Sequence, residues 1–266
     1  MTSFKVGVQL HPQHTSIDDL RAAWREADDL GVDSIWTWDH FYPLYESGQP
    51  HTPGHPGTDL TGSHFEGWSL LAAMAVDTQR AQLGVLVTCN SYRNPELLAD
   101  MARTIDHLSG GRVILGIGAG WFEKDYEEYG YEFGTAPSRL RALGEALPRI
   151  EARLSKLNPP PLGELPILIG GGGEKVTLRL VAQHAGAWNT FGPPEHFAAK
   201  SRILDQHCAE VGRDPAEIER TVALNDAGDV DKVDAYLEAG AQHLILGRGQ
   251  PFDLAPVRAL VEARDR

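Results

Sequence analysis

Short apolar runs and longer amphipathic segments alternate along the whole chain. Eight runs have the length and composition of buried strands: residues 5–10, 34–40, 81–89, 112–120, 166–170, 187–192, 220–225 and 241–247. A segment with apolar positions at helical spacing follows each run: residues 18–31, 68–76, 95–109, 138–154, 174–186, 194–212, 230–240 and 254–264. The pattern therefore predicts eight successive strand–helix units.

Strands that alternate with helices form parallel sheets covered by helices. Eight units in 266 residues fit a closed (β/α)₈ TIM barrel, with residues 1–266 as a single domain. A doubly wound open sheet is the competing architecture. It usually carries a glycine-rich nucleotide loop after the first strand, whereas this chain has HPQHTS at residues 11–16. We therefore predict the barrel.

Composition and charge narrow the range of partners. The net charge is -13 at pH 7, which disfavours nucleic acid and anionic membranes, because both bind basic faces. With Cys89 and Cys208 as the two cysteines, a disulfide framework or a cysteine-based zinc site is not expected. We find neither a signal-peptide pattern nor an apolar run of membrane-spanning length. We expect a cytoplasmic protein whose partner is a small-molecule substrate.

In a barrel, functional residues gather just after the C-terminal ends of the strands. The segments at those places are richer in His, Trp, Gly and Asn than the strand starts: LHPQHT, WDHFYP, VTCNSYRNP, GIGAGWFE, GGGGEK, WNTFGPP, ALNDAG and LGRGQP. This asymmetry predicts one site at that mouth of the barrel.

Four adjacent glycines separate the fifth predicted strand from its helix, although glycine weakens regular structure. Backbone N–H groups and the positive end of the helix dipole bind anions at such a place, and glycine lets the backbone approach a phosphate. The alternative is a turn without a ligand. We predict that a phosphate-bearing ligand binds here, through Gly170, Gly171, Gly172, Gly173 and Lys175, with Lys175 in the first helical turn.

A second set of glycines ends the fourth predicted strand. Gly116, Gly118 and Gly120 alternate, which places them on one face of the strand. A bare face at the mouth would leave room for a flat ligand. The alternative is tight packing against a neighbouring strand or helix.

The stretch WTWDHFYP ends the second predicted strand. Trp36 and Trp38 share one face and are expected near the mouth, and Asp39 and His40 follow them. Histidine is the usual general acid or base near neutral pH, and a neighbouring aspartate can orient it or shift its pKa. Adjacent strand residues point to opposite faces, so the two need not touch. We predict that His40 and Asp39 are catalytic.

Several of these motifs occur together in one order. The sequence D-H-F at residues 39–41, the strand LGVLVT, then LSGGR, GIGAGW and GGGGEK resemble the luciferase-like flavin and deazaflavin oxidoreductase superfamily. They are most similar to its actinobacterial members that use coenzyme F420. The resemblance extends from residue 6 to about residue 192 and weakens over the last quarter of the chain.

The resemblance implies a (β/α)₈ barrel with the cofactor at the C-terminal mouth and its phosphate at residues 170–173. It implies a bulge at residues 85–88 that braces the central ring, with a non-prolyl cis peptide at the Leu86–Val87 bond. It also places Asp39 beside the deazaflavin and implicates His40 in catalysis. The residues expected to bind the cofactor are Asp39, Leu86, Val87, Thr88, Gly118, Gly170, Gly171, Gly172, Gly173 and Lys175.

The chain departs from the family pattern in two places. Trp121 stands where the sugar-phosphate dehydrogenases of the family place a catalytic glutamate, and Glu123 is the nearest carboxylate. This disfavours a sugar-phosphate substrate. The links at residues 154–166 and 225–233 are shorter than usual for the family, so we expect shortened insertion regions and a more open mouth.

We expect coenzyme F420 as the cofactor, with hydride transfer to or from a small organic substrate. FMN is the alternative, because it also carries a ribityl phosphate, and it would indicate a monooxygenase. The acidic tail of F420 requires basic side chains, and Arg93, Lys124, Lys175 and Arg248 all follow strands. A homodimer is expected because homodimers are common in the superfamily.

Two further functions stay open. A metal-dependent barrel hydrolase is one, because six of the eleven histidines lie in the first 64 residues: His11, His14, His40, His51, His55 and His64. Such hydrolases usually carry His-x-His after the first strand, whereas HPQH has a wider spacing, and we predict no metal ligand. A non-catalytic F420-binding protein is the other, because Trp121 replaces the acid.

Overall fold

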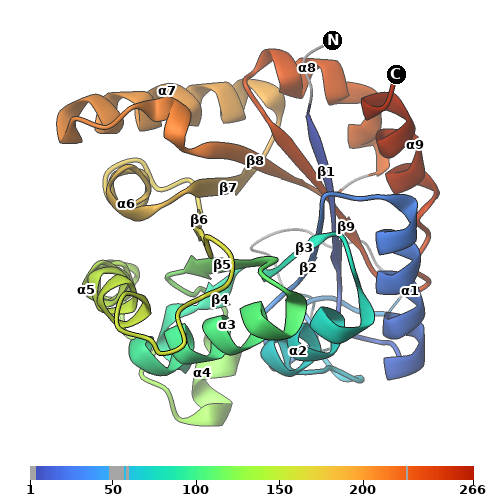
Figure 1. The fold of residues 1–266 in the computed structure, drawn as a ribbon, viewed down its shortest axis with the longest axis horizontal. Coiled ribbons are helices and arrows are strands. Elements are labelled where there is room, and N and C mark those ends of the chain that lie inside the picture. The colour runs from blue at the N-terminus through green and yellow to red at the C-terminus, as the bar shows by residue number, and fades with distance from the viewer. Residues whose placement is uncertain (1–3, 48–56, 58–59, 226) are drawn as a thin grey trace.

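The computed structural model describes residues 4–47, 57, 60–225 and 227–266, and in this part of the chain the strands form one parallel barrel surrounded by helices (Figure 1). The strands are β1 (Lys5–Leu10), β2 (Ser34–Thr37), β3 (Gln82–Val85), β4 (Thr88–Cys89), β5 (Val113–Gly118), β6 (Ile167–Gly170), β7 (Ala187–Phe191), β8 (Glu219–Leu224) and β9 (His243–Arg248). The barrel closes because β1 pairs with β2 and β9, while β3 pairs with β2 and β5. The predicted closed barrel is confirmed, and the open doubly wound sheet is wrong.

The helices follow the strands as the sequence pattern predicts. They are α1 (Ile17–Leu30), α2 (Gly67–Asp77), α3 (Pro95–Ser109), α4 (Glu123–Tyr129), α5 (Ala136–Leu154), α6 (Thr177–His184), α7 (Pro194–Val211), α8 (Val233–Glu238) and α9 (Ala255–Arg264). Local chemistry fixes their ends. Ser16 caps α1 by accepting from the Asp19 amide, and Gly31 ends it in the left-handed conformation. No helix in the described part of the chain is long and apolar enough to cross a membrane.

Three elements differ from the prediction. The third predicted strand is divided into β3 and β4, with a cis peptide at Leu86–Val87 as the resemblance implies. Helix α4 was not expected, since its seven residues are too short to show periodicity. Helix α6 begins at Thr177, so Lys175 lies in the preceding turn and not in the first helical turn.

The inside of the barrel holds its own apolar cluster, formed by Trp36, Leu86, Ile114, Leu168, Ala187 and Ile245. The Trp36 side chain is fully buried there, and its indole N–H donates to Ser34 Oγ at 2.6 Å. Gly84 leaves room for this ring, because a Cβ at Gly84 would clash with a Trp36 ring carbon. The expectation that Trp36 lies near the mouth is wrong.

A polar cluster at the opposite end of the barrel connects four strands, β1, β2, β8 and β9. Glu219 accepts from Lys5 Nζ at 2.6 Å and is 2.8 Å from His243 Nδ1. The other His243 nitrogen, Nε2, is 2.8 Å from Ser34 Oγ. Burial alone would raise the pKa of Glu219, but hydrogen bonds from His243 and Lys5 lower this pKa to about 2. These contacts at the amino ends of the strands therefore stabilise the fold.

Candidate active site

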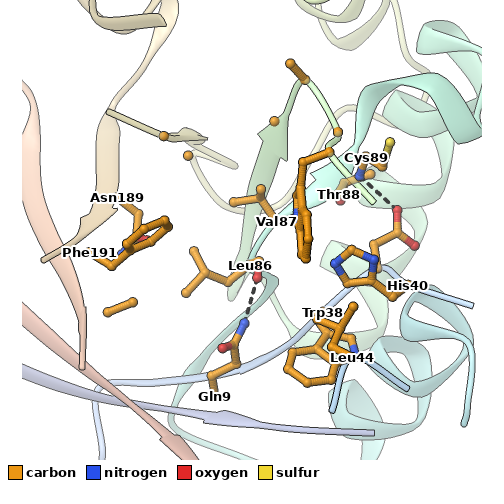
Figure 2. A pocket seen from close by; sticks show the side chains of 18 of the residues that line it. Gln9, Trp38, His40, Leu44, Leu86, Val87, Thr88, Cys89, Asn189 and Phe191 are labelled. Carbon is orange, nitrogen blue, oxygen red and sulfur yellow. Dashed lines mark hydrogen bonds between the residues drawn. The ribbon is translucent and has the colours of Figure 1, made fainter. Parts of the chain in front are cut away.

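A cavity of about 510 Å³ opens at the carboxyl ends of the strands (Figure 2). Residues from β1, β4, β5, β6, β7, β8 and the loops after β2 and β8 contribute to its wall. Figure 2 shows Trp38, His40 and Leu44 on one side and Asn189 and Phe191 on the other, with the bulge between them. Its size is ordinary for a small-molecule site, and its place is the one predicted from the sequence.

Most of the residues predicted for the site line this cavity: Asp39, His40, Leu86, Val87, Thr88, Gly118, Gly170 and Gly171. Trp38 and Trp121 line it as well. Gly172, Gly173 and Lys175 are not among the lining residues, and Lys175 is exposed. The structure thus brings the predicted catalytic pair, the bulge and the start of the glycine loop to one cavity.

His40 is oriented by a residue that the sequence did not indicate. Its Nδ1 is 2.7 Å from Oδ2 of Asp125 on α4, and the Asp125 side chain is fully buried. Asp125 also accepts from the Phe41 amide at 3.0 Å and from the Tyr92 hydroxyl at 2.9 Å. Because a carboxylate only accepts hydrogen bonds, Nδ1 carries a proton. The remaining nitrogen, Nε2, is the one available for acid–base chemistry.

Asp39, the sequence neighbour of His40, has a separate set of partners. Its two carboxylate oxygens accept from the Arg93 guanidinium at 2.7 and 3.0 Å, and Oδ2 also accepts from the Cys89 amide at 3.0 Å. Burial raises the pKa of Asp39, while the Arg93 charge and these hydrogen bonds oppose the shift. The other Arg93 partner is Glu66 at 2.6 Å. Arg93 therefore braces the site through two carboxylates, and its suggested role as a cation for the cofactor tail stays a prediction.

The bulge between β3 and β4 projects into the cavity. Gln9 Nε2 donates to the Leu86 carbonyl at 2.6 Å and fixes the bulge from β1 (Figure 2). The Val87 side chain occupies the space beside two glycines, because a Cβ at Gly118 or Gly170 would lie 2.8 or 2.9 Å from it. These glycines are therefore needed for packing against the bulge, which for Gly118 is the alternative that the sequence had left open.

Gly116 and Gly120 also have packing reasons. A Cβ at Gly116 would meet the Val85 carbonyl, and one at Gly120 would meet the Tyr126 hydroxyl. That hydroxyl lies 3.1 Å from Cys89 Sγ. Burial raises the pKa of the Cys89 thiol to about 11, so this thiol is neutral and is no nucleophile near pH 7.

The glycine loop has the form of a phosphate cradle. Gly171 has φ +118°, and its N–H donates to the Asn189 carbonyl at 2.9 Å. The N–H groups of Gly172 and Gly173 donate to no acceptor within the described residues. A Cβ at Gly173 would lie 2.7 Å from the Thr177 hydroxyl. The loop thus offers backbone donors and a hydroxyl at the N-terminus of α6, a combination that fits a phosphate group.

A lysine that the sequence did not indicate, Lys200 of α7, lies beside this loop. A Cβ at Gly172 would lie 3.7 Å from Lys200 Cε, and Lys200 Nζ donates to Glu174 at 2.6 Å. Lys200 and Glu174 are 26 residues apart in the chain, so a pattern of neighbouring residues does not reveal their contact.

The histidines of the first loops are dispersed among different partners. His11 Nδ1 lies 2.5 Å from the Tyr45 hydroxyl, and the Trp38 indole donates to His64 Nε2 at 3.0 Å. Burial lowers the pKa of His64 to about 3. His51 and His55 lie outside the described residues. Among the residues that are described, no three metal-ligating side chains gather.

Comparison with known proteins identifies a matching protein family and several related proteins. The model of the family described as luciferase-like monooxygenase matches residues 1–255. The chain is 30% identical over 223 residues to a phthiodiolone/phenolphthiodiolone dimycocerosates ketoreductase of Mycobacterium bovis (strain BCG / Pasteur 1173P2), covering 74% of this chain and 58% of that protein. It is 29% identical over 201 residues to an F420-dependent glucose-6-phosphate dehydrogenase of Amycolatopsis mediterranei, covering 68% of this chain and 54% of that protein. The chain thus spans little more than half the length of these two relatives.

Solved structures show the same fold at low sequence identity. An F420-dependent secondary alcohol dehydrogenase in complex with an F420-acetone adduct superimposes with a TM-score of 0.82 at 17% identity and covers 100% of both chains. The FMN complex of the oxygenating constituent of 3,6-diketocamphane monooxygenase, from Pseudomonas putida, superimposes with a TM-score of 0.72 at 15% identity. That match covers 98% of this chain and 96% of the other.

Proposed function

Because the chain belongs to the luciferase-like monooxygenase family, we propose that it is a coenzyme F420-dependent oxidoreductase. In this proposal it transfers a hydride between the deazaflavin and a small organic substrate. A relative and a similar structure that are F420-dependent by name support the choice of cofactor. The observation that carries the proposal is the His40 imidazole on the cavity wall, with Nδ1 held by the buried Asp125.

The residues around the cavity fit such a cofactor. In our proposal residues 170–173 hold its phosphate, because two N–H groups of this loop find no acceptor in the described chain. Residues 86–88, with Gly118 beside them, hold its ring. Lys175 follows Glu174 in the chain and Lys200 donates to the Glu174 carboxylate, so both add positive charge near the phosphate end. When bound, the deazaflavin would itself be the carrier that accepts or donates the hydride.

The proton is the part of the chemistry that this chain supplies. When an alcohol is oxidised, His40 Nε2 takes the hydroxyl proton as the C–H bond gives up its hydride. When a carbonyl is reduced, Nε2 returns the proton to the oxygen as the carbon accepts the hydride. Asp125 stabilises the imidazolium formed in the first case and keeps the ring in one orientation.

FMN is the second candidate cofactor. The family description and the FMN-bound structure support it, and a phosphate cradle cannot distinguish two ribityl phosphates. Flavin chemistry here would consume oxygen, whereas the deazaflavin reacts poorly with it. Oxygen uptake by protein loaded with each cofactor distinguishes the two functions.

The experiment that tests the proposal is a substitution of the proton-transfer residue. Purified protein is assayed with F420 and a panel of alcohols, or with reduced F420 and a panel of carbonyl compounds, by following the absorbance of the oxidised deazaflavin. We expect His40→Gln to lower turnover by about 10²- to 10⁴-fold, with the Kd for F420 changed by less than about threefold. His107→Gln, at a half-buried histidine on α3 that does not line the cavity, is the control. Unchanged turnover in His40→Gln would refute the role of His40, and failure of F420 to bind would refute the cofactor assignment.

The assembly and location of the enzyme stay proposals. We propose a homodimer in the cytoplasm, and light scattering of the purified protein measures the number of subunits.

A further inference from the structure

The cavity wall carries no permanent positive charge. None of its lining residues within the described chain is a lysine or an arginine. The segments at residues 48–56 and 58–59, which belong to the long loop after β2, also contain neither residue type in the sequence. The loop that follows the catalytic histidine therefore cannot supply a lysine or arginine to a substrate.

Two basic side chains beside the His40 side of the cavity are bound to other groups. Arg93 binds Asp39 and Glu66, and only 11% of its side chain is exposed. Lys124 lies 3.5 Å from Glu128 and over the Tyr42 ring. To gain Arg93 as a partner, an anionic substrate would have to displace Asp39, which would leave that buried carboxylate uncompensated.

The His40 side of the cavity is mainly apolar and aromatic. Trp38, Leu44 and Trp121 line it, and the His40 ring contacts the edge of the Trp121 ring at a centroid distance of 5.6 Å. Its other polar groups already have protein partners. Thr88 Oγ1 accepts from the Trp68 indole at 3.1 Å, and the Tyr92 hydroxyl donates to Asp125.

We propose, resting on the oxidoreductase function above, that the substrate is an uncharged, largely apolar carbonyl compound or the corresponding alcohol. Its single oxygen binds at His40 Nε2, and its hydrocarbon part contacts the aromatic wall. In the reduction, the carbonyl carbon gains a hydride from the reduced deazaflavin, the C=O π bond breaks, and the oxygen takes the proton from Nε2. Phosphorylated and carboxylated substrates are excluded, because burying an ionised group without a partner costs several kcal/mol.

The test compares substrates that differ mainly in charge. Protein loaded with reduced F420 is assayed without oxygen on 4-methylcyclohexanone and 4-oxocyclohexanecarboxylate, and on straight-chain methyl ketones and keto acids of matched length. We expect kcat/KM for the neutral member of each pair to exceed that for the acid by about 100-fold or more. Equal or better turnover of the acids overturns the proposal, and so does F420 binding without turnover of any neutral carbonyl. Failure of F420 to bind is a separate result that refutes the underlying function.

A charge introduced at the cavity rim tests the same idea from the other side. Trp121 is 38% exposed, so Trp121→Arg places a guanidinium at the wall without filling the core. We expect this variant to reduce the preference for the neutral substrate by at least about tenfold, mainly through a lower KM for the acid. Trp121→Met, the uncharged control, keeps the neutral preference. An unchanged preference in Trp121→Arg, with the fold verified by circular dichroism, contradicts the electrostatic basis of the proposal.

Discussion

Substitution of Asp125 by asparagine tests the histidine–carboxylate pair in depth. The change keeps the shape of the side chain but replaces one acceptor oxygen by an amide donor. All three groups that contact Asp125 are donors: His40 Nδ1 at 2.7 Å, the Tyr92 hydroxyl at 2.9 Å and the Phe41 amide at 3.0 Å. Whichever way the amide is turned, at least one donor then faces another donor.

Two quantities follow from this geometry. Leaving one buried donor without an acceptor lowers the free energy of unfolding by about 1–3 kcal/mol. Activity falls further, because His40 can move its proton from Nδ1 to Nε2 when an amide nitrogen faces Nδ1. Correct protonation of a general acid or base contributes about 10²- to 10⁴-fold, so we expect Asp125→Asn to lower kcat by at least about 100-fold.

The assay separates positioning from folding. Hydride transfer, F420 affinity and urea unfolding are measured for Asp125→Asn and for Glu127→Gln, an exposed change on the same helix. We expect lower kcat in Asp125→Asn, a Kd for F420 within about threefold of the parent, and no effect of Glu127→Gln. A folded Asp125→Asn variant with the kcat of the parent would refute the view that Asp125 orients His40.

Three further substitutions test the loop, the brace and the far end of the barrel. Gly171→Asp, at φ +118°, should raise the Kd for F420 by at least about 100-fold in a fluorescence titration, whereas Gly212→Asp, at the end of α7, should not. Arg93→Met leaves the buried Asp39 unpaired and should lower the free energy of unfolding in urea by about 3–5 kcal/mol; an unchanged midpoint would contradict this. Since the pKa of Glu219 is lowered to about 2, its stabilisation is present above pH 4.5 and is lost as the pH falls toward 2. Glu219→Gln should therefore destabilise the protein at pH 7 and match the parent near pH 2, and an equal loss at both pH values would refute the linkage.

The barrel was predictable because its signal is local and repeated. Each strand buries both faces, so it appears as a compact apolar run, and each helix shows one apolar stripe. The glycines at Gly118 and Gly170 were also visible, but the residue that they pack against was not. They make room for Val87, a contact between strands that no spacing along the chain reveals.

The site was predictable only in part, because its decisive contacts join distant segments. His40 was visible from its place at a strand end, whereas its partner Asp125 lies 85 residues further along. Asp125 falls within the motif GWFEKDYEEYG, where it is one of four acidic residues and nothing marks it as the buried one. Arg93 was visible as a cation near the mouth, but only the fold shows that it is paired with Asp39.

Residues on the same face of a strand also lie at different depths along the barrel axis. The alternation of side chains between the two faces does not show this depth. Trp36 and Trp38 both fit the predicted face of the second strand. In the closed barrel Trp36 belongs to the interior cluster, while Trp38, two residues closer to the mouth, lines the cavity. Depth along the barrel axis depends on how the strands are staggered, and stagger is a property of the closed sheet.

The most direct test of the central claim is a pair of anaerobic titrations of purified apo-protein, one with F420 and one with FMN. Trp38 and Trp121 line the cavity, so a bound ring should quench the tryptophan fluorescence. We predict micromolar or tighter binding of F420, with FMN at least about tenfold weaker. Binding of FMN alone, or of neither cofactor, would contradict the assignment of this barrel as an F420-dependent oxidoreductase.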